Sequence, residues 1–151
     1  MNVLLFEDAG VDHLYPITTG RPAYAISSGA YRLVDLLLAR GVTVKGVVRK
    51  HLAGIQQADF PGLCEQFSSP EKTLFINARA VPAATLVDRI LHWASETFEG
   101  VVHSQDSVAA AVLPADKTTP AGNLRYEQLD DFFGFAGLSG APSATLEVPL
   151  F

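Results

Sequence analysis

An apolar run near the start of the sequence passes directly into charged and small residues: Val3-Leu4-Leu5-Phe6-Glu7-Asp8-Ala9-Gly10. Four apolar residues in succession followed by a turn-forming cluster are typical of a short buried strand. Two further segments share this character. Residues 42–48 are rich in β-branched side chains, and residues 73–77 are apolar up to Asn77. The sequence therefore predicts three core strands.

Helical segments are expected between and after these strands. The first ends at Gly41, the second stops at Pro61-Gly62, and the third places four large apolar residues on one face. The predicted helices span residues 30–40, 51–60 and 83–95, and the apolar face of the third carries Leu86, Val87, Ile90 and Leu91. Alternating strands and helices are typical of a mostly parallel sheet with helices on both faces, the Rossmann-like α/β class.

The C-terminal third of the sequence predicts additions to this core. Residues 100–103 and 108–113 flank a polar turn and favour a β-hairpin. A short helix is expected around residues 126–133 and a last strand at residues 144–151. The length of 151 residues fits a single domain, residues 1–151, with one core. Because the sequence ends on two apolar residues, we expect it to be the N-terminal part of a longer protein.

Composition excludes several classes of protein. The hydrophobic share of 48% and the charged share of 18% are those of a globular chain. A net charge of −5 argues against nucleic-acid binding, which relies on a dense basic surface. No apolar window is long enough to cross a membrane, and no signal peptide precedes the first strand. Together with the single cysteine, Cys64, these features predict a cytoplasmic domain. Whether it forms homo-oligomers stays open.

Polar residues follow each predicted core strand, in residues 7–21, 49–51 and 77–82. Ligands of open parallel sheets bind beyond the carboxyl ends of the strands, so these segments are the candidate site. They carry Arg21, Arg49 and Arg79, whose planar guanidinium groups suit phosphate. The long irregular stretch before residue 28 is of a kind that is usually functional. A role for these arginines as solvated surface residues stays open.

Two segments resemble motifs of the nucleotide-sugar pyrophosphorylases. Pro16-Ile17-Thr18-Thr19-Gly20-Arg21-Pro22 is similar to that family's P-L-T-x-x-x-P loop, and residues 73–82 resemble its strand ending in N-G-D before a helix. The chain resembles more closely a divergent subgroup of sugar nucleotidyltransferases. In these proteins, as in the acetylglucosamine-1-phosphate uridyltransferase/acetyltransferase, such a domain precedes a left-handed β-helix. The resemblance covers residues 3–38 and 73–91.

The resemblance implies a nucleotide-diphosphosugar-transferase-like fold that transfers a nucleotidyl group from a nucleoside triphosphate to a sugar 1-phosphate. Arg21 and Arg79 would be the catalytic phosphate contacts, and Asp8 would be the Mg²⁺ ligand, with Asp12 as a second candidate. Turn or cap roles for both aspartates stay open. The residues that the resemblance assigns to nucleotide or nucleotide-sugar binding are Gly10, Asp12, His13, Thr18 and Asn77.

Several positions depart from the family's pattern. Only Gly10 remains of the glycine-rich turn, His13 stands at the arginine position, and Ala23 stands at the lysine position. Arg79 occupies the place of the Mg²⁺-binding aspartate. These departures favour an alternative function, a non-catalytic domain that keeps the fold for nucleotide-sugar binding or assembly. The sequence identifies neither the base nor the sugar.

Overall fold

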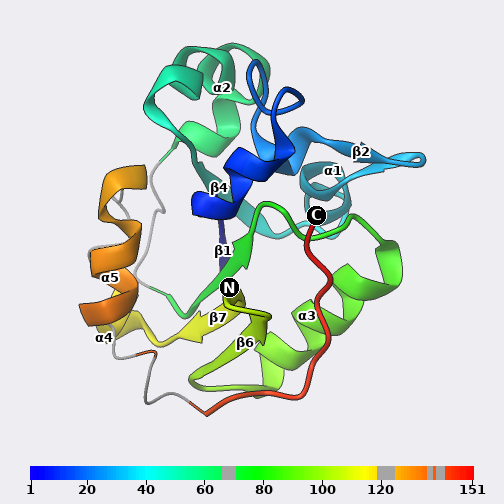
Figure 1. Cartoon of the computed structure of the whole chain (residues 1–151). Helices are drawn as coiled ribbons and strands as arrows, with labels where there is room; N and C mark the ends of the chain where they lie inside the picture. The colour runs from blue at the N-terminus through cyan, green and yellow to red at the C-terminus, as the bar shows by residue number, and fades with distance from the viewer. Residues whose placement is uncertain (66–70, 119–124, 136–137, 139–141) are drawn as a thin grey trace.

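A five-stranded mixed sheet forms the centre of the molecule (Figure 1). The computed structural model describes residues 1–65, 71–118, 125–135, 138 and 142–151. The strands lie in the order β4-β1-β5-β7-β6. Their bounds are β1 Asn2–Phe6, β4 Thr43–Val47, β5 Thr73–Asn77, β6 Gly100–Ser104 and β7 Ser107–Leu113.

Three of these strands confirm the parallel core. β1 pairs in parallel with β4 on one side and with β5 on the other. The predicted hairpin is also confirmed, since β7 pairs antiparallel with both β5 and β6. The sheet is nevertheless mixed rather than mostly parallel. Only two residues, Gln105 and Asp106, connect β6 to β7, and a connection this short can join only antiparallel neighbours.

Helices cover the sheet, and two sequence predictions about the elements need correction. The helix expected from residue 30 begins later, because Tyr31–Arg32 form strand β3 and pair with β2, Ser27–Ser28. The strand expected at residues 144–151 does not form: Leu150 makes one isolated bridge to Ala80, and Pro149 lacks the N–H that a ladder needs. The α-helices are α1 Leu33–Leu38, α2 Ala53–Asp59, α3 Ala84–Glu96, α4 Ala115–Thr118 and α5 Leu129–Phe135. None of the helices in the described ranges has the length and apolar character to cross a membrane.

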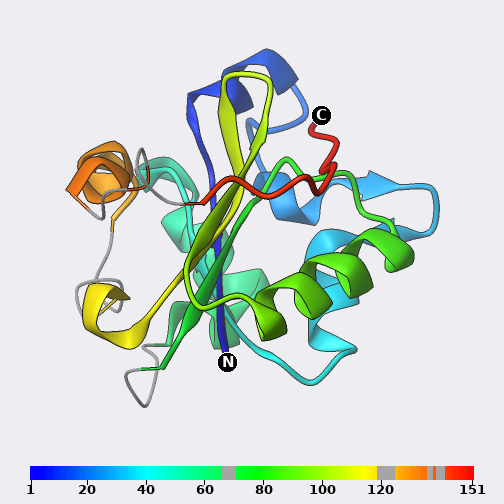
Figure 2. The same ribbon diagram turned by 90° about the horizontal axis from the view of Figure 1, so that it is seen from below.

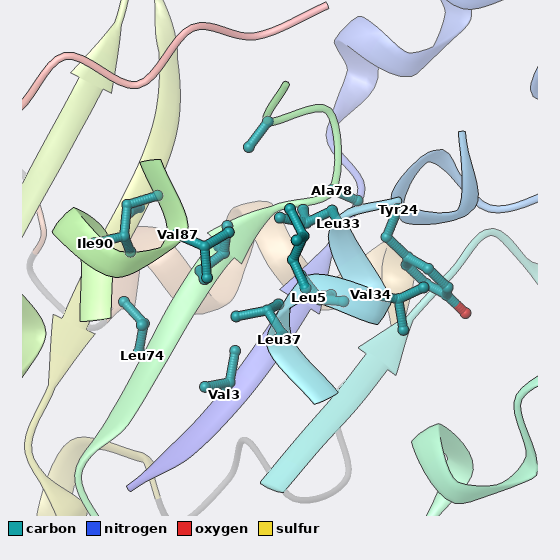
Figure 3. Packing of buried hydrophobic residues seen from close by; sticks show 14 of the residues in the cluster. Val3, Leu5, Tyr24, Leu33, Val34, Leu37, Leu74, Ala78, Val87 and Ile90 are labelled. Carbon is teal, nitrogen blue, oxygen red and sulfur yellow. The ribbon is translucent and has the colours of Figure 1, made fainter. Parts of the chain in front are cut away.

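Helices cover both faces of the sheet, as predicted (Figure 2). The single core expected from the length is instead two apolar clusters, one on each face, because the sheet separates them. Successive residues of β1 point to opposite faces. Val3 and Leu5 therefore pack with α1 and α3, whereas Leu4 and Phe6 pack with α5. In Figure 3, Val87 and Ile90 of α3 and Leu33 and Leu37 of α1 lie over Val3, Leu5 and Leu74 of the strands.

The C-terminal segment, residues 142–151, runs beside α3 and ends near the carboxyl end of β5 (Figure 1). The N–H of Val81 donates to the carbonyl of Pro149 at 3.0 Å, and the N–H of Phe151 donates to the carbonyl of Arg79 at 2.9 Å. These bonds fix the last residues of the chain against the loop that follows β5.

Replacing Ile90 by alanine tests whether α3 is packed as described. The side chain is fully buried against the sheet, so Ile90→Ala should lower the free energy of unfolding by about 2–5 kcal/mol. Leu38→Ala is the control, because Leu38 is 48% exposed and its truncation should have a much smaller effect. Denaturant melts measure both. Equal losses in the two variants would show that α3 does not cover the core.

Candidate functional site

The carboxyl ends of β1 and β5 lie side by side. Phe6 and Asn77 are register partners in the parallel ladder, so the residues that follow each strand meet at one edge of the sheet. The sequence analysis grouped residues 7–21 and 77–82 at this edge, and the structure confirms that they meet there. The candidate site is built from these two segments and from the turn between β6 and β7.

An ion pair between Asp8 and Arg79 forms the centre of this edge. Nε of Arg79 donates to Oδ1 of Asp8 at 2.7 Å, and Nη2 donates to Oδ2 at 2.8 Å. This is the bidentate geometry in which a guanidinium fork binds a carboxylate most strongly. The Arg79 side chain is 9% exposed and the Asp8 side chain 20% exposed. The pair is therefore largely shielded from solvent.

Neighbouring groups complete the hydrogen bonding of this pair. Nδ2 of Asn77 donates to Oδ2 of Asp8 at 2.8 Å, and Oδ1 of Asn77 accepts from the N–H of Arg79 at 3.0 Å. Nη2 of Arg79 also donates to Oγ of Ser107 at 2.9 Å, and Nη1 donates to the carbonyl of Phe151 at 2.8 Å. Four of the five N–H groups of the guanidinium are thus engaged.

Gly10 is the residue over which the guanidinium lies. A Cβ built at Gly10 would overlap Cζ and Nη2 of Arg79. The N–H of Gly10 donates to Oδ1 of Asp8 at 3.1 Å. The resemblance implied a role for Gly10 in nucleotide binding. In the structure, the absent side chain makes room for Arg79.

The pKa of Asp8 reflects two opposing effects. Burial by itself would raise the pKa of this carboxyl, whereas hydrogen bonds from Arg79 and Asn77 and the charge of Arg79 lower it. The balance leaves the pKa below its ordinary value. Asp8 is therefore ionised at neutral pH and balances the charge of Arg79.

A second ion pair anchors the loop after β1. The Glu7 side chain is fully buried, and its Oε2 accepts from Nε of Arg49 at 3.0 Å. Its Oε1 accepts from the N–H of Ala23 at 2.9 Å. Nη2 of Arg49 in turn donates to the carbonyl of Thr18 at 2.8 Å. These contacts hold the long loop against the end of β4, so Arg49 stabilises the loop from within.

The remaining predicted residues lie along this loop. Thr18 is buried and donates from Oγ1 to the carbonyl of Val11 at 3.3 Å, which makes it part of the loop's own packing. Asp12, His13 and Arg21 are exposed. In the described part of the chain, no hydrogen-bond or ion-pair partner holds Arg21. Its guanidinium is therefore available to a ligand.

Two pockets open beside the ion pairs. One, of about 300 Å³, lies at the carboxyl end of β1, with Asp8, Gly10 and Ser107 on one side and Phe6, Leu129 and Phe133 among its apolar walls. The other, of about 370 Å³, is lined by loop residues that include Asp12 and Thr18, together with Arg49 and His51. Both lie where ligands of α/β sheets bind.

The described residues do not fit a Mg²⁺ ion at Asp8. Both carboxylate oxygens already accept hydrogen bonds from Arg79, and the guanidinium brings its own positive charge. Among the described residues, no group of three or more His, Cys, Asp or Glu side chains could hold a metal ion. The Mg²⁺ requirement implied by the resemblance therefore has no structural support at this position.

Sequence reasoning missed two contributors to the site. Glu7 was treated only as part of a polar strand end. A carboxylate directly after a buried apolar strand is expected to need a cationic partner, and in the structure that partner is Arg49. Ser107 was placed in the hairpin turn without a role, and its sequence context carries no signal of its contact with Arg79.

The fold is that of an α/β domain with polar loops at the carboxyl ends of its parallel strands, where open sheets of this class bind their ligands. The model of the sugar nucleotidyl transferase family matches residues 3–137. The chain belongs to this family. No match was found among curated proteins.

A solved structure shares the fold. It is a Bacillus anthracis protein assigned as a glucose-1-phosphate thymidylyltransferase, in complex with a sucrose. The TM-score is 0.55 at 12% sequence identity, and the match covers 98% of this chain and 87% of that chain. At this identity the similarity shows the fold alone.

Gly10→Ala tests the packing of Arg79 on Gly10. The added methyl group would overlap the guanidinium, so the variant should lose about 1–3 kcal/mol of unfolding free energy. Gly54→Ala is the matched control: Gly54 lies in α2, no atom approaches the position of its Cβ, and alanine should stabilise the helix by about 0.5–1 kcal/mol. Denaturant melts compare the two. A stabilising Gly10→Ala would contradict the described contact.

Asp8→Asn tests the contribution of the ion pair through its pH dependence. The folded pKa of Asp8 is depressed, so its stabilisation is complete above the unfolded pKa of about 4 and is lost as the pH falls through the folded value. At neutral pH the variant should lose about 1–3 kcal/mol, and the loss should shrink below roughly pH 4. Asp88→Asn, which breaks the exposed pair with Arg40, should have a much smaller effect. A pH-independent difference between wild type and Asp8→Asn would contradict the role of the charge.

Proposed function

We propose that this sugar nucleotidyl transferase domain transfers a nucleotidyl group from a nucleoside triphosphate to a sugar 1-phosphate at the carboxyl end of β1. The pocket of about 300 Å³ between residues 8–10 and the β6–β7 turn carries the proposal, because it lies at the edge where the family's fold receives ligands. Its volume is at the small end for ligand pockets. It accommodates one part of the substrate, and the remainder extends over the loop.

The walls of this pocket suit the base. Phe6 and Leu129 form its buried apolar lining, and the partly exposed ring of Phe133 can stack on a nucleobase, whichever base it is. Ser107 also lines the pocket, and its hydroxyl, which accepts from Arg79, can donate to the ribose or to an acceptor on the base. The phosphates then extend toward the loop that carries Arg21.

The proposed reaction is a displacement at the α-phosphorus. An oxygen of the sugar phosphate forms a bond to this phosphorus, the bond to the oxygen that bridges to the β-phosphate breaks, and pyrophosphate leaves with that electron pair. Negative charge accumulates on the phosphate oxygens, so cationic donors at this position lower the barrier. Arg21 is the exposed cation of the loop and is the proposed phosphate contact. Contact with Arg79 requires the pair with Asp8 to open.

A second function, nucleotide-sugar binding without turnover, is favoured by one observation. Arg79, the other arginine expected to stabilise the transferred group, uses its fork on Asp8 rather than on a ligand. A domain of this kind would bind the product class and would release no pyrophosphate. The two functions are separated by measuring binding and turnover on the same preparation.

Arg21→Ala tests the proposed phosphate contact. A hydrogen bond to a charged group contributes about 1.5–3 kcal/mol, so the variant should bind UTP or a nucleotide-sugar about 10- to 150-fold more weakly in calorimetric titration. Arg89→Ala is the control. Arg89 is also exposed but lines a different pocket, next to the C-terminal segment, and its removal should leave the affinity unchanged.

Pyrophosphate release from UTP and glucose 1-phosphate then distinguishes the two functions. Release that Arg21→Ala abolishes supports transfer, whereas binding without release supports the non-catalytic function. If no nucleotide or nucleotide-sugar binds at millimolar concentration, both are wrong.

A further inference from the structure

Asp8 has no acceptor position left for an added cation. Its Oδ1 accepts from the N–H of Gly10 and from Nε of Arg79, and its Oδ2 accepts from Nδ2 of Asn77 and from Nη2 of Arg79. A carboxylate offers about four lone-pair directions in total. All four are directed at protein donors at 2.7–3.1 Å. A metal ion at Asp8 would have to remove at least one of them.

The guanidinium of Arg79 is also held by groups other than Asp8. Ser107 at the start of β7 and the carbonyl of Phe151 accept from its two terminal nitrogens, and Gly10 lies against the guanidinium. Three segments far apart in the sequence thus hold one cation. A surface arginine commonly pairs with one nearby carboxylate and can move freely. Moving Arg79 would instead break its contacts with all three segments.

We propose that Arg79 is the built-in cation of this site, occupying the place at Asp8 that a divalent ion would need, and that the site binds its phosphate ligand without a metal ion at Asp8. A divalent ion approaching Asp8 would meet the full charge of a guanidinium whose side chain is only 9% exposed, so solvent screens the repulsion weakly. The part of this inference that concerns the ligand rests on the proposed function. The part that concerns the metal rests on the ion pair alone.

Charge reversal at position 79 gives the sharpest test. In Arg79→Asp, a second carboxylate would face Asp8 beside the side-chain amide of Asn77, and such hard oxygen ligands are those that Mg²⁺ and Mn²⁺ prefer. We expect the wild-type melting temperature to be the same in EDTA and in millimolar Mg²⁺. The melting temperature of Arg79→Asp should rise by several degrees in Mg²⁺, because an ion that binds only the folded state stabilises it.

Arg79→Ala is the matched control, since it removes the guanidinium without supplying a second carboxylate and should gain little from Mg²⁺. An Arg79→Asp variant that is folded by circular dichroism but gains no more from Mg²⁺ than Arg79→Ala would overturn the proposal. If Arg79→Asp fails to fold, direct Mn²⁺ binding to the wild-type chain, followed by electron paramagnetic resonance, decides. Uptake of one Mn²⁺ that Asp8→Asn abolishes overturns the proposal, and no such uptake supports it.

Calorimetric titration of the wild type with UDP-glucose, in EDTA and in Mg²⁺, tests the ligand. A nucleotide-sugar is the right probe because its two phosphates chelate Mg²⁺ less than a triphosphate does. Affinities within about twofold of each other support the proposal, and tightening by about tenfold or more in Mg²⁺ overturns it. If UDP-glucose binds in neither buffer, the proposed function loses its support, while the Mn²⁺ and Arg79→Asp measurements still decide the inference about the metal.

Discussion

The bidentate ion pair between Asp8 and Arg79 is the interaction on which the carboxyl edge of the sheet depends. It joins the second residue after β1 to the second residue after β5, and its hydrogen bonds extend to the start of β7 and to the end of the C-terminal segment. Removing either partner would leave the other charge largely buried, which is unfavourable for a group that water no longer solvates. The positions of four segments are thus linked by one pair of charges.

The site contains two ion pairs, Glu7–Arg49 and Asp8–Arg79, and they stabilise different parts of it. Glu7 is fully buried, and its pair with Arg49 holds the long loop to the end of β4. Asp8 borders a pocket, but both of its carboxylate oxygens accept hydrogen bonds from Arg79. Arg21, on the exposed part of the loop, is left as a cation whose charge the described residues do not neutralise.

The strands were predictable because their signals are local. Residues 3–6 and 73–77 are apolar without interruption, and strands buried on both faces show this pattern. The start of α1 was placed too early because the pairing of Ser27 with Arg32 across Gly29 competes with the helix, and a leucine-rich pattern does not reveal that competition. The C-terminal strand was wrong for a related reason. Its residues alternate suitably, but Pro149 interrupts the donors and the segment is held by single bridges instead.

The sequence predicts where the site lies in the fold but not which of its side chains bind one another. That polar residues after β1 and β5 meet at one edge follows from parallel pairing, which the sequence indicates. The bond between Asp8 and Arg79 spans 71 residues, and opposite charges at adjacent strand ends were the only signal for it. The sequence analysis assigned both residues to a ligand, Arg79 to phosphate and Asp8 to metal. It thereby separated two groups that bind each other.

The substitution of a guanidinium for a metal-binding group changes what the site depends on. A bound ion contributes according to its concentration and can be removed, because its binding is an equilibrium with solvent. A covalently attached cation is always present, and the free energy of placing it becomes part of the folding free energy. Its placement then needs structural support, which Gly10 provides by leaving space and Ser107 provides by accepting a hydrogen bond. Gly10, Asp8 and Arg79 therefore form one unit. A side chain at position 10 would exclude the guanidinium, and without the guanidinium Asp8 would be a partly buried carboxylate without a counter-ion. The single glycine that remains of the family's glycine-rich turn is thus explained by the arginine it accommodates.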